Sequence, residues 1–383
     1  SKICKEEDLM PKALLIAEKP DLMRKIKEVY DKHKNEVPYE IDFESQRGHL
    51  LTLKTPDKLD PSLKSYSWDT LPINPEDYGG FQYEVIKEKK QGNFMTSQER
   101  FDQIKEKICS GKYDYVINAG DPDQEGELLI RIVLSQMNNK LPILRFWTND
   151  LTDAHILKAL QTMKDDEKDP MLVRLLDAAY CRQHSDYRVG MNVSRAASMK
   201  ANGKVAAGRV KTPTLGMVVK REIEIQEFKP KTVYGVKAVY DEGFEGTLFA
   251  AANMQTADEE EEETDKSAGT IWFETKKEAD DLIATLDKTA TVVEYTAKRE
   301  QSYAPKLFKL ATAQREAGKL GYNAADTQRI IQGLYEKKIM SYPRTGCEYI
   351  HSDENFKAML KSASNVPELA SFVAGITDED IAR

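Results

Sequence analysis

The 383-residue chain lacks several features that mark common classes of protein. Its cysteines, Cys4, Cys109, Cys181 and Cys347, form no Cys-x-x-Cys pair, which argues against a zinc ribbon or a disulfide framework and fits a reducing cytoplasm. No apolar run approaches the roughly 20 residues that span a bilayer, so we expect no membrane partner. The five histidines show no metal-ligand spacing. No Gly-x-x-x-x-Gly-Lys-Ser/Thr loop is present either, so an ATP-driven motor is not expected.

Basic residues are fewer than acidic ones, and the net charge of −8 argues weakly against a nucleic acid partner. This average hides two opposed segments. Residues 254–265 hold seven acids and no base, and we interpret this run, centred on 258–263, as a solvated loop without a role in chemistry. From Cys181 to Arg221, nine Lys and Arg residues accompany a single acid, Asp186. Phosphate backbones require such a concentrated positive surface, although a solubilising face is the alternative.

Two strand-turn-helix units indicate a parallel α/β sheet. Residues 13–17 form an apolar run, Pro20 can begin a helix, and Leu22, Ile26 and Val29 follow at helical spacing. The second unit has a strand at 115–117, a turn at 118–124 and a helix from Glu125. Because parallel strands present their carboxyl ends at one edge of a sheet, both acidic turns are expected to meet there.

The rest of the chain changes character several times. Residues 153–222 are helical and basic, and alternation with period two begins near Lys231, with a hairpin turn at 241–243. After Pro305 the pattern is helical again, with a break at Gly321. The further elements that we expect are strands at 269–273 and 289–296, and helices at 276–287, at 310–320 and after Asn323.

The strongest chemical motif is the acidic turn from Gly120 to Glu127. Asp121, Asp123 and Glu125 stand at alternate positions after a strand, which makes a cage of hard oxygens suited to Mg²⁺. The alternative is a solvated helix start, where acids are also favoured. Glu18-Lys19 at the end of the other strand favours the metal site, because an acid and a base then flank it.

Two further motifs carry hydroxyls and cations. In the segment from Ile339 to Gly346, Pro343 keeps Tyr342 out of a helix, so its hydroxyl is expected to be presented beside Arg344. A tyrosine can form a covalent phosphodiester if a cation offsets the developing charge, although it can equally be structural. The turn from Ala207 to Leu215 surrounds a proline with two cations and two hydroxyls, which suits phosphate binding.

Taken in order, these motifs resemble a type IA DNA topoisomerase, most closely the bacterial topoisomerase III branch, over about Pro11 to Ile350. The matching motifs are Ala17-Glu18-Lys19-Pro20, Gly48-His49-Leu50, Trp68 with Leu71-Pro72, Asp121 to Gly126, Asp186 to Asn192 with Ser194-Arg195, Gly208 to Pro213, and Ser341 to Thr345. The implied fold is multidomain: a Rossmann-like α/β Toprim domain (11–150), a helical DNA-binding domain (151–225), a β-rich arch (226–302) and a helical domain with the nucleophile (303–383).

The resemblance implies a role for each matching residue. Tyr342 would attack single-stranded DNA, forming a 5′-phosphotyrosyl bond and releasing a 3′-hydroxyl, with Arg344 and Lys19 offsetting phosphate charge. Glu18 would shuttle a proton to the leaving hydroxyl and join the Mg²⁺ ligands. The other implied metal ligands are Asp121, Asp123 and Glu125. The residues implied in binding the strand are Trp68, Arg182, His184, Asn192, Arg195, Ala206, Ala207, Gly208, Arg209, Val210 and Lys211. Cations that follow the backbone, with aromatic stacking, are typical of single-strand binding.

The chain departs from the family pattern at three positions. Gly346 replaces an acid that follows the nucleophile motif, Gln124 replaces an arginine beside the metal ligands, and Lys211 replaces a glutamine. Family members also continue well past the nucleophile domain, so the chain is interpreted as the N-terminal part of a longer enzyme. We expect it to act in a bacterial cytoplasm, and to bind and cleave DNA without strand passage. The alternatives are a Toprim nuclease and an inert single-strand-binding fragment.

Overall fold

The computed structural model describes residues 10–88, 94–248, 270–299, 301, 305–350 and 356–377. The acidic run at 254–265 therefore lies outside the described residues. The chain divides into two compact units, one formed by Ser1–Thr212 with Ala304–Arg383 and the other by Pro213–Tyr303. Within the described ranges, no helix is long and apolar enough to cross a membrane.

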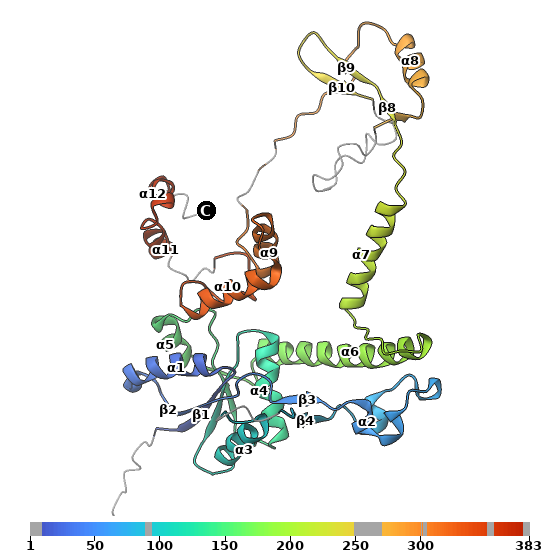
Figure 1. Ribbon diagram of the computed structural model, residues 1–383. Helices are drawn as coiled ribbons and strands as arrows, with labels where there is room; N and C mark the ends of the chain where they lie inside the picture. Colours follow the sequence, from blue (N-terminus) through green and yellow to red (C-terminus); the bar gives the residue numbers. More distant parts are fainter. Residues whose placement is uncertain are drawn as a thin grey trace, which may run out of the picture. The chain divides into compact units, whose positions relative to one another are not determined.

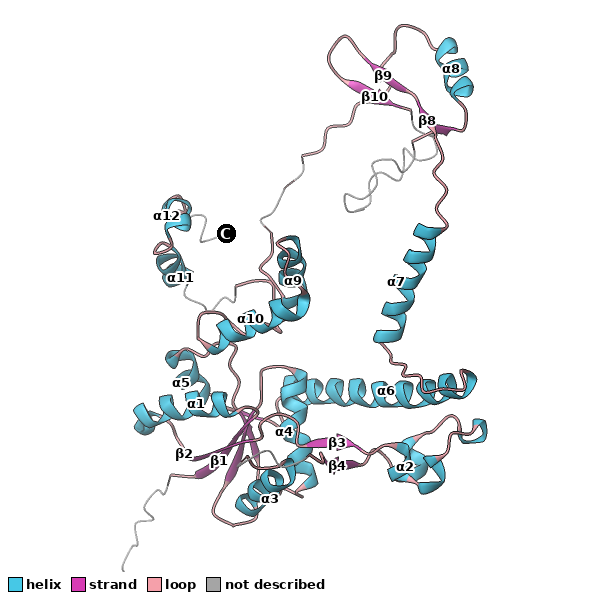
Figure 2. Ribbon diagram, in the orientation of Figure 1, coloured by secondary structure: helices cyan, strands magenta, loops and turns pink. Residues whose placement is uncertain are grey.

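The predicted α/β sheet is confirmed in the first unit (Figures 1 and 2), where the strand order is β2-β1-β5-β6-β7. The first four strands are parallel and β7 pairs antiparallel with β6 at the edge. Their bounds are β1 Lys12–Ala17, β2 Glu40–Ser45, β5 Tyr115–Ala119, β6 Ile143–Arg145 and β7 Lys164–Asp165. Residues 13–17 of β1 are fully buried, because helices cover both faces of the sheet, and such strands have continuous apolar sequences.

Each face of the sheet has its own core. On one face, alternate residues of β1 pack with α1 (Pro20–Lys32) and α5 (Asp153–Gln161), and Leu22, Ile26 and Val29 of α1 are buried as predicted. On the other face, Leu14 and Ile16 pack with α3 (Ser97–Ile108) and α4 (Gln124–Gln136). The two-residue alternation along β1 thus assigns each side chain to one of the two cores.

Helix α6 (Pro170–Lys200) extends the first unit beyond the sheet (Figure 1). Leu128 and Ile132 of α4 form a small core with Ala179 of α6. The ribbon of β3 (Leu51–Leu53) and β4 (Tyr83–Val85) leads to a lobe of short helices. The helices of this lobe are α2 Pro56–Leu59, η2 Pro61–Lys64, η3 Trp68–Thr70 and η4 Pro75–Tyr78, and η1 Lys34–Glu36 follows α1.

The C-terminal part of the first unit is helical. It contains α9 Leu310–Lys319, α10 Ala324–Glu336, α11 Phe356–Ala363 and α12 Pro367–Ala374. Gly321 has φ +90° after α9, and the Asn323 side chain caps α10 by accepting from the Asp326 amide at 2.8 Å, which explains the predicted break and restart. Tyr335 and Tyr342 pack into the same core as α1. This packing brings α10 and the segment after it back to the sheet.

The second unit holds most of α7 (Lys211–Gln226) and a β-rich segment. Its other elements are β8 Tyr234–Gly235, β9 Lys237–Val239, β10 Glu245–Thr247, β11 Trp272–Phe273 and α8 Lys276–Thr285. The predicted hairpin turn is present, with Gly243 at φ +89° between β9 and β10. The strand predicted at 289–296 is wrong: this stretch has no regular structure, and Val293 is 94% exposed. Apolar residues at strand spacing form no strand here, because no neighbouring strand pairs with them in the described residues.

Candidate active site

The acidic residues of the two turns meet because their strands are neighbours. Ala17, the last residue of β1, pairs with Ala119, the last residue of β5. The chain then continues as Glu18 on one strand and as Gly120-Asp121 on the other. The Asp121 amide donates to the Glu18 carboxylate at 3.3 Å. The expected meeting of the two turns at one sheet edge is therefore present.

Close backbone packing fixes the turn after β5. A Cβ on Gly120 would lie 2.1 Å from the Gly126 carbonyl oxygen, and a Cβ on Gly126 would lie 2.3 Å from the Asp121 carbonyl oxygen. Only glycine fits at either position. Asp123 begins α4 by accepting a hydrogen bond from the Gly126 amide at 2.7 Å. The turn thus holds Asp121 and Asp123 in place through its backbone.

Beneath this turn lies a buried charge pair that the motif analysis missed. The Arg145 guanidinium is fully buried, and its Nη1 donates to the carbonyls of Asn118 and Gly120, while its Nη2 donates to that of Asp121 at 2.8 Å. Its Nε lies 2.8 Å from the Glu127 carboxylate. Burial raises the pKa of Glu127 above its ordinary value, against the pull of Arg145. The only signal in the sequence was an arginine ending an otherwise apolar strand.

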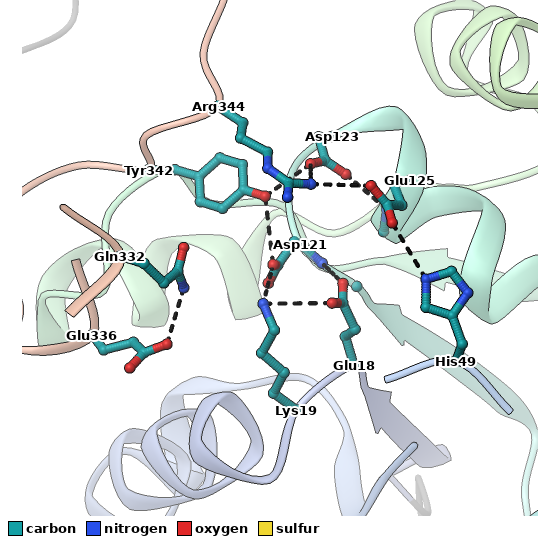
Figure 3. A network of polar contacts seen from close by, with 12 residues as sticks. Glu18, Lys19, His49, Asp121, Asp123, Glu125, Gln332, Glu336, Tyr342 and Arg344 are labelled. Atoms are coloured by element: carbon teal, nitrogen blue, oxygen red, sulfur yellow. Dashed lines mark hydrogen bonds and ion pairs between the residues drawn. The ribbon is translucent and has the colours of Figure 1, made fainter. Parts of the chain in front are cut away.

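Tyr342, in the segment after α10, also lies at this edge (Figure 3). Its hydroxyl donates to Asp123 Oδ2 at 2.8 Å and lies 3.4 Å from Asp121 Oδ2. Its amide donates to the Asn149 carbonyl at 2.8 Å, and its ring packs edge-on against Tyr335. Only 3% of the residue is exposed. Burial and the neighbouring carboxylates raise the pKa of Tyr342 above its ordinary value, so the phenol is neutral in this state.

Two cations and a histidine complete the polar network (Figure 3). Lys19 Nζ lies 2.6 Å from Asp121 Oδ2 and 3.5 Å from Glu18 Oε1. Arg344 Nη1 lies 3.0 Å from Glu125 Oε2, and His49 Nε2 lies 3.3 Å from Glu125 Oε1. The His49 hydrogen bond and the Arg344 charge lower the pKa of Glu125 to about 2, although burial opposes them. The sequence identified His49 only as part of a family motif and did not predict its contact with Glu125.

The pKa of Glu18 is shifted in the opposite direction. Burial raises it above its ordinary value, and the Asp121 charge adds to this effect while Lys19 opposes it. A carboxyl that holds its proton to a higher pH can donate it to a developing oxyanion, and perturbed groups of this kind gather at functional sites.

Some of the residues predicted to bind DNA lie beside this site. Arg182 lines a cavity of about 190 Å³ together with Glu125 and Asp186. The Arg209 Nε lies 2.8 Å from Asp186 Oδ1, so the turn that follows α6 is joined to the same region. Ala206, Val210 and Lys211 are exposed, while Ala207 and Gly208 are half-buried. Ser194 holds this turn by donating to the Ala207 carbonyl and accepting from its amide.

Other predicted DNA-binding side chains are engaged within the protein. Arg195 is 5% exposed, donates to the Leu63 carbonyl at 2.7 Å and lies over the Tyr66 ring. Asn192 bonds both the amide and the carbonyl of Ile73. His184 stacks on Phe81 with ring centroids 3.6 Å apart, whereas Trp68 on the lobe is 60% exposed. Binding of DNA by these four residues stays a prediction.

Comparisons with known proteins identify the family of the chain. Residues 13–150 match the family described as Toprim domain, and residues 172–381, more than half of the chain, match the family described as DNA topoisomerase. The chain belongs to the DNA topoisomerase family. The resemblance to type IA topoisomerases is thereby confirmed. The four domain bounds given above are not tested by these matches and stay a prediction.

Two curated topoisomerases illustrate the likeness. DNA topoisomerase 3 of Bacillus cereus is 32% identical over 354 residues, and that of Bacillus subtilis is 31% identical over 351 residues. Each alignment covers 90% of this chain and 44% of the relative, so the chain spans less than half of their length. A solved full-length topoisomerase I from Thermotoga maritima matches in fold, with a TM-score of 0.53 and 21% identity over 92% of this chain and 52% of that one.

The Toprim domain of this topoisomerase family is a metal-binding domain, and the acids here fit a hard cation in type. They converge in pairs: Asp121 and Asp123 both approach the Tyr342 hydroxyl, while Asp123 and Glu125 both approach Arg344 Nη1. No group of three or more His, Cys, Asp or Glu side chains is gathered for a metal within the described residues. A third ligand therefore requires a side-chain movement.

The three departures from the topoisomerase pattern lie at different places around the site. Gln124 lines the same cavity as Arg182, so a cation still faces this side of α4. A Cβ on Gly346 would meet nothing within 4 Å, and Arg344 finds its partners in Glu125 and Asp123 instead. Lys211 is exposed where α7 begins. None of the three alters the contact between Tyr342 and the acids.

Proposed function

We propose that this chain carries the centre for DNA cleavage and religation of an ATP-independent type IA topoisomerase that acts on single-stranded DNA in the bacterial cytoplasm. One observation carries the proposal: the Tyr342 hydroxyl donates to Asp123, 219 positions earlier in the chain. A nucleophile, two cations and a cluster of acids thus meet at the carboxyl edge of a parallel sheet, which is where α/β proteins bind their ligands. Relaxation or decatenation by strand passage belongs to the full-length enzyme.

The chemistry follows from the contacts of each group. The Tyr342 oxygen attacks a backbone phosphorus and loses its proton, for which Asp123 is the hydrogen-bonded acceptor. The bond from phosphorus to the 3′-oxygen breaks, and Glu18, whose pKa is raised, protonates that oxygen. Lys19 and Arg344 offset the charge on the phosphate. Reversal rejoins the strand, and no ATP is needed because the tyrosyl ester conserves the energy of the phosphodiester.

Mg²⁺ fits beside the nucleophile in this proposal. Asp121, Asp123 and Glu125 are the residues that would hold it, together with Glu18. When bound, the ion supplies positive charge among carboxylates that otherwise oppose ionisation of Tyr342. Asp123 still accepts the proton, and Lys19 and Arg344 still orient the phosphate.

Access to Tyr342 requires a movement. The side chain is buried against the acids, and Lys338 pairs with Asp153 across the contact between the C-terminal helices and the sheet domain. A strand therefore reaches the hydroxyl only when the segment that carries α9 and α10 moves away from the acidic edge. The ion pair between Lys338 and Asp153 is weak enough to permit this movement.

The test is a covalent adduct. The chain is incubated with labelled single-stranded DNA and Mg²⁺, the reaction is stopped with detergent, and the linked residue is mapped. Tyr342→Phe should abolish the adduct and retain DNA binding, while Tyr335→Phe, in the same aromatic pair, should retain both.

Each other outcome has a clear meaning. An adduct that persists in Tyr342→Phe contradicts the assignment of the nucleophile. Cleavage that leaves free ends on both sides, and that Asp121→Asn stops, indicates a Toprim nuclease instead. Binding without any Mg²⁺-dependent product indicates an inert single-strand-binding fragment.

A further inference from the structure

A second cavity shares His49 with the cavity beside Glu125. It has a volume of about 330 Å³, at the small end of the range of ligand pockets. His49 lines this cavity and also the one that contains Glu125 and Arg182. The backbone amide of Gln46 donates to the Ala17 carbonyl, and the backbone amide of Gly48 donates to the Glu18 carbonyl, both at 2.9 Å. The cavity is thus fixed directly to the strand end that bears Glu18.

Two residues that line the cavity carry buried polar atoms without hydrogen-bond partners. Gln46 is 1% exposed, and both its amide nitrogen and its amide oxygen lack a hydrogen-bond partner. The Nε of Arg100, which also lines the cavity, is buried without a partner as well. Buried polar groups in folded proteins are nearly always paired with protein, water or ligand, so this donor and acceptor are free to bond a group that enters the cavity. One amide offers one donor and one acceptor to that ligand.

The wall of the cavity carries an aromatic ring and cations. Phe94 is 63% exposed, and the Arg47 guanidinium lies 4.7 Å from its ring centroid. Arg47 has φ +67°, a backbone conformation that residues other than glycine rarely adopt. The acid on this wall, Glu88, already accepts from the amide and the hydroxyl of Ser97. With Arg47 and Arg100 against Glu88, the described residues that line the cavity carry more positive than negative charge.

We infer that this cavity is a subsite for one nucleobase, with its ring stacked on Phe94, its edge bonded by the Gln46 amide and its phosphate near Arg47. Bidentate bonding by glutamine is a common way to read a base edge, and stacking on aromatic rings is how single strands are held. The volume admits one base and excludes an oligonucleotide. The inference rests on the proposed function, since the base would belong to the strand cut by Tyr342.

The test uses the full chain and a randomised single-stranded library with Mg²⁺. The DNA joined to the protein is sequenced, so every position is numbered from the cut. One position should favour one base by about 5- to 150-fold, the discrimination of a bidentate contact. Gln46→Leu and Phe94→Ala should flatten that position alone and leave the other positions unchanged. Phe228→Ala, at a 71% exposed phenylalanine outside the cavity, is the matched control.

Stability and free nucleosides provide two further measurements. Gln46→Leu replaces an unpartnered buried amide with an apolar group of similar size, so its melting temperature should not fall. The four deoxynucleosides are also titrated separately into the unaltered chain and into Phe94→Ala. Binding that Phe94→Ala abolishes, combined with an unchanged library profile, assigns the cavity to a free nucleoside instead of a base of the strand.

The inference and the proposed function fail in different ways. If adducts form but both variants give the profile of the unaltered chain, and no deoxynucleoside binds, the base subsite is overturned while cleavage by Tyr342 stands. If the chain forms no adduct with any member of the library, both are overturned.

Discussion

The acidic edge of the sheet and the basic segment of α6 with its following turn differ in what fixes their side chains. At the acidic edge, paired strand ends, two glycines without room for a Cβ and three carbonyl contacts of Arg145 set the positions. In the basic segment, Arg209 is exposed and held by one acid, whereas Arg195 is buried and serves the lobe. Backbone geometry identifies a site more reliably than the number of charges does.

This comparison predicts the largest effect at Arg145. Arg145→Met leaves Glu127 buried without its cation and removes the hydrogen bonds of the guanidinium to four carbonyls, so it should lower the free energy of unfolding by about 3–5 kcal/mol. The yield of the covalent adduct with DNA should fall together with the stability. Denaturant unfolding measures the loss, with Arg24→Met on the exposed face of α1 as the control. A variant as stable as the unaltered chain would show that the pair does not support the turn.

A smaller effect is expected at the glycine turn. Gly126→Ala places a Cβ 2.3 Å from the Asp121 carbonyl, and relief of that overlap should cost about 1–3 kcal/mol and displace Asp121 from Lys19. Adduct yield and thermal unfolding report the two consequences. Gly203→Ala in the basic segment, where a Cβ comes no nearer than 3.7 Å to an atom beyond its chain neighbours, should change neither. Equal effects at the two glycines would remove the difference between the regions.

The smallest effect belongs to the basic segment. Arg209→Ala and Lys211→Ala should each weaken single-strand binding and reduce the slope of log affinity against log salt by about one. Fluorescence anisotropy at several salt concentrations measures the slope. Arg195→Met tests the predicted DNA contact of this residue separately: because the guanidinium is bonded to the Leu63 carbonyl, a fall in the slope means that it leaves Leu63 when DNA binds. An unchanged slope would contradict its place among the DNA-binding residues.

Much of the sheet domain and of the acidic site could be predicted from the sequence, for physical reasons. Residues 13–17 and the turn from Gly120 to Glu127 were identifiable because buried parallel strands are apolar and their ends share an edge. Arg145 was not, since nothing in a sequence shows which carbonyls a buried guanidinium will meet. The strand expected at 289–296 failed because apolar spacing does not supply a pairing partner. The roles of Asn192 and Arg195 depend on contacts with the lobe, which the pattern of basic residues does not reveal.

At rest, Tyr342 is protected from adventitious chemistry. Its ring is nearly inaccessible to water, and a pKa raised by burial and two carboxylates leaves almost no phenolate at neutral pH. Electrophiles and small phosphate esters in a cell therefore meet an inert group. In the proposed reaction, Tyr342 becomes available only while the segment that carries α9 and α10 is held away from the acidic edge.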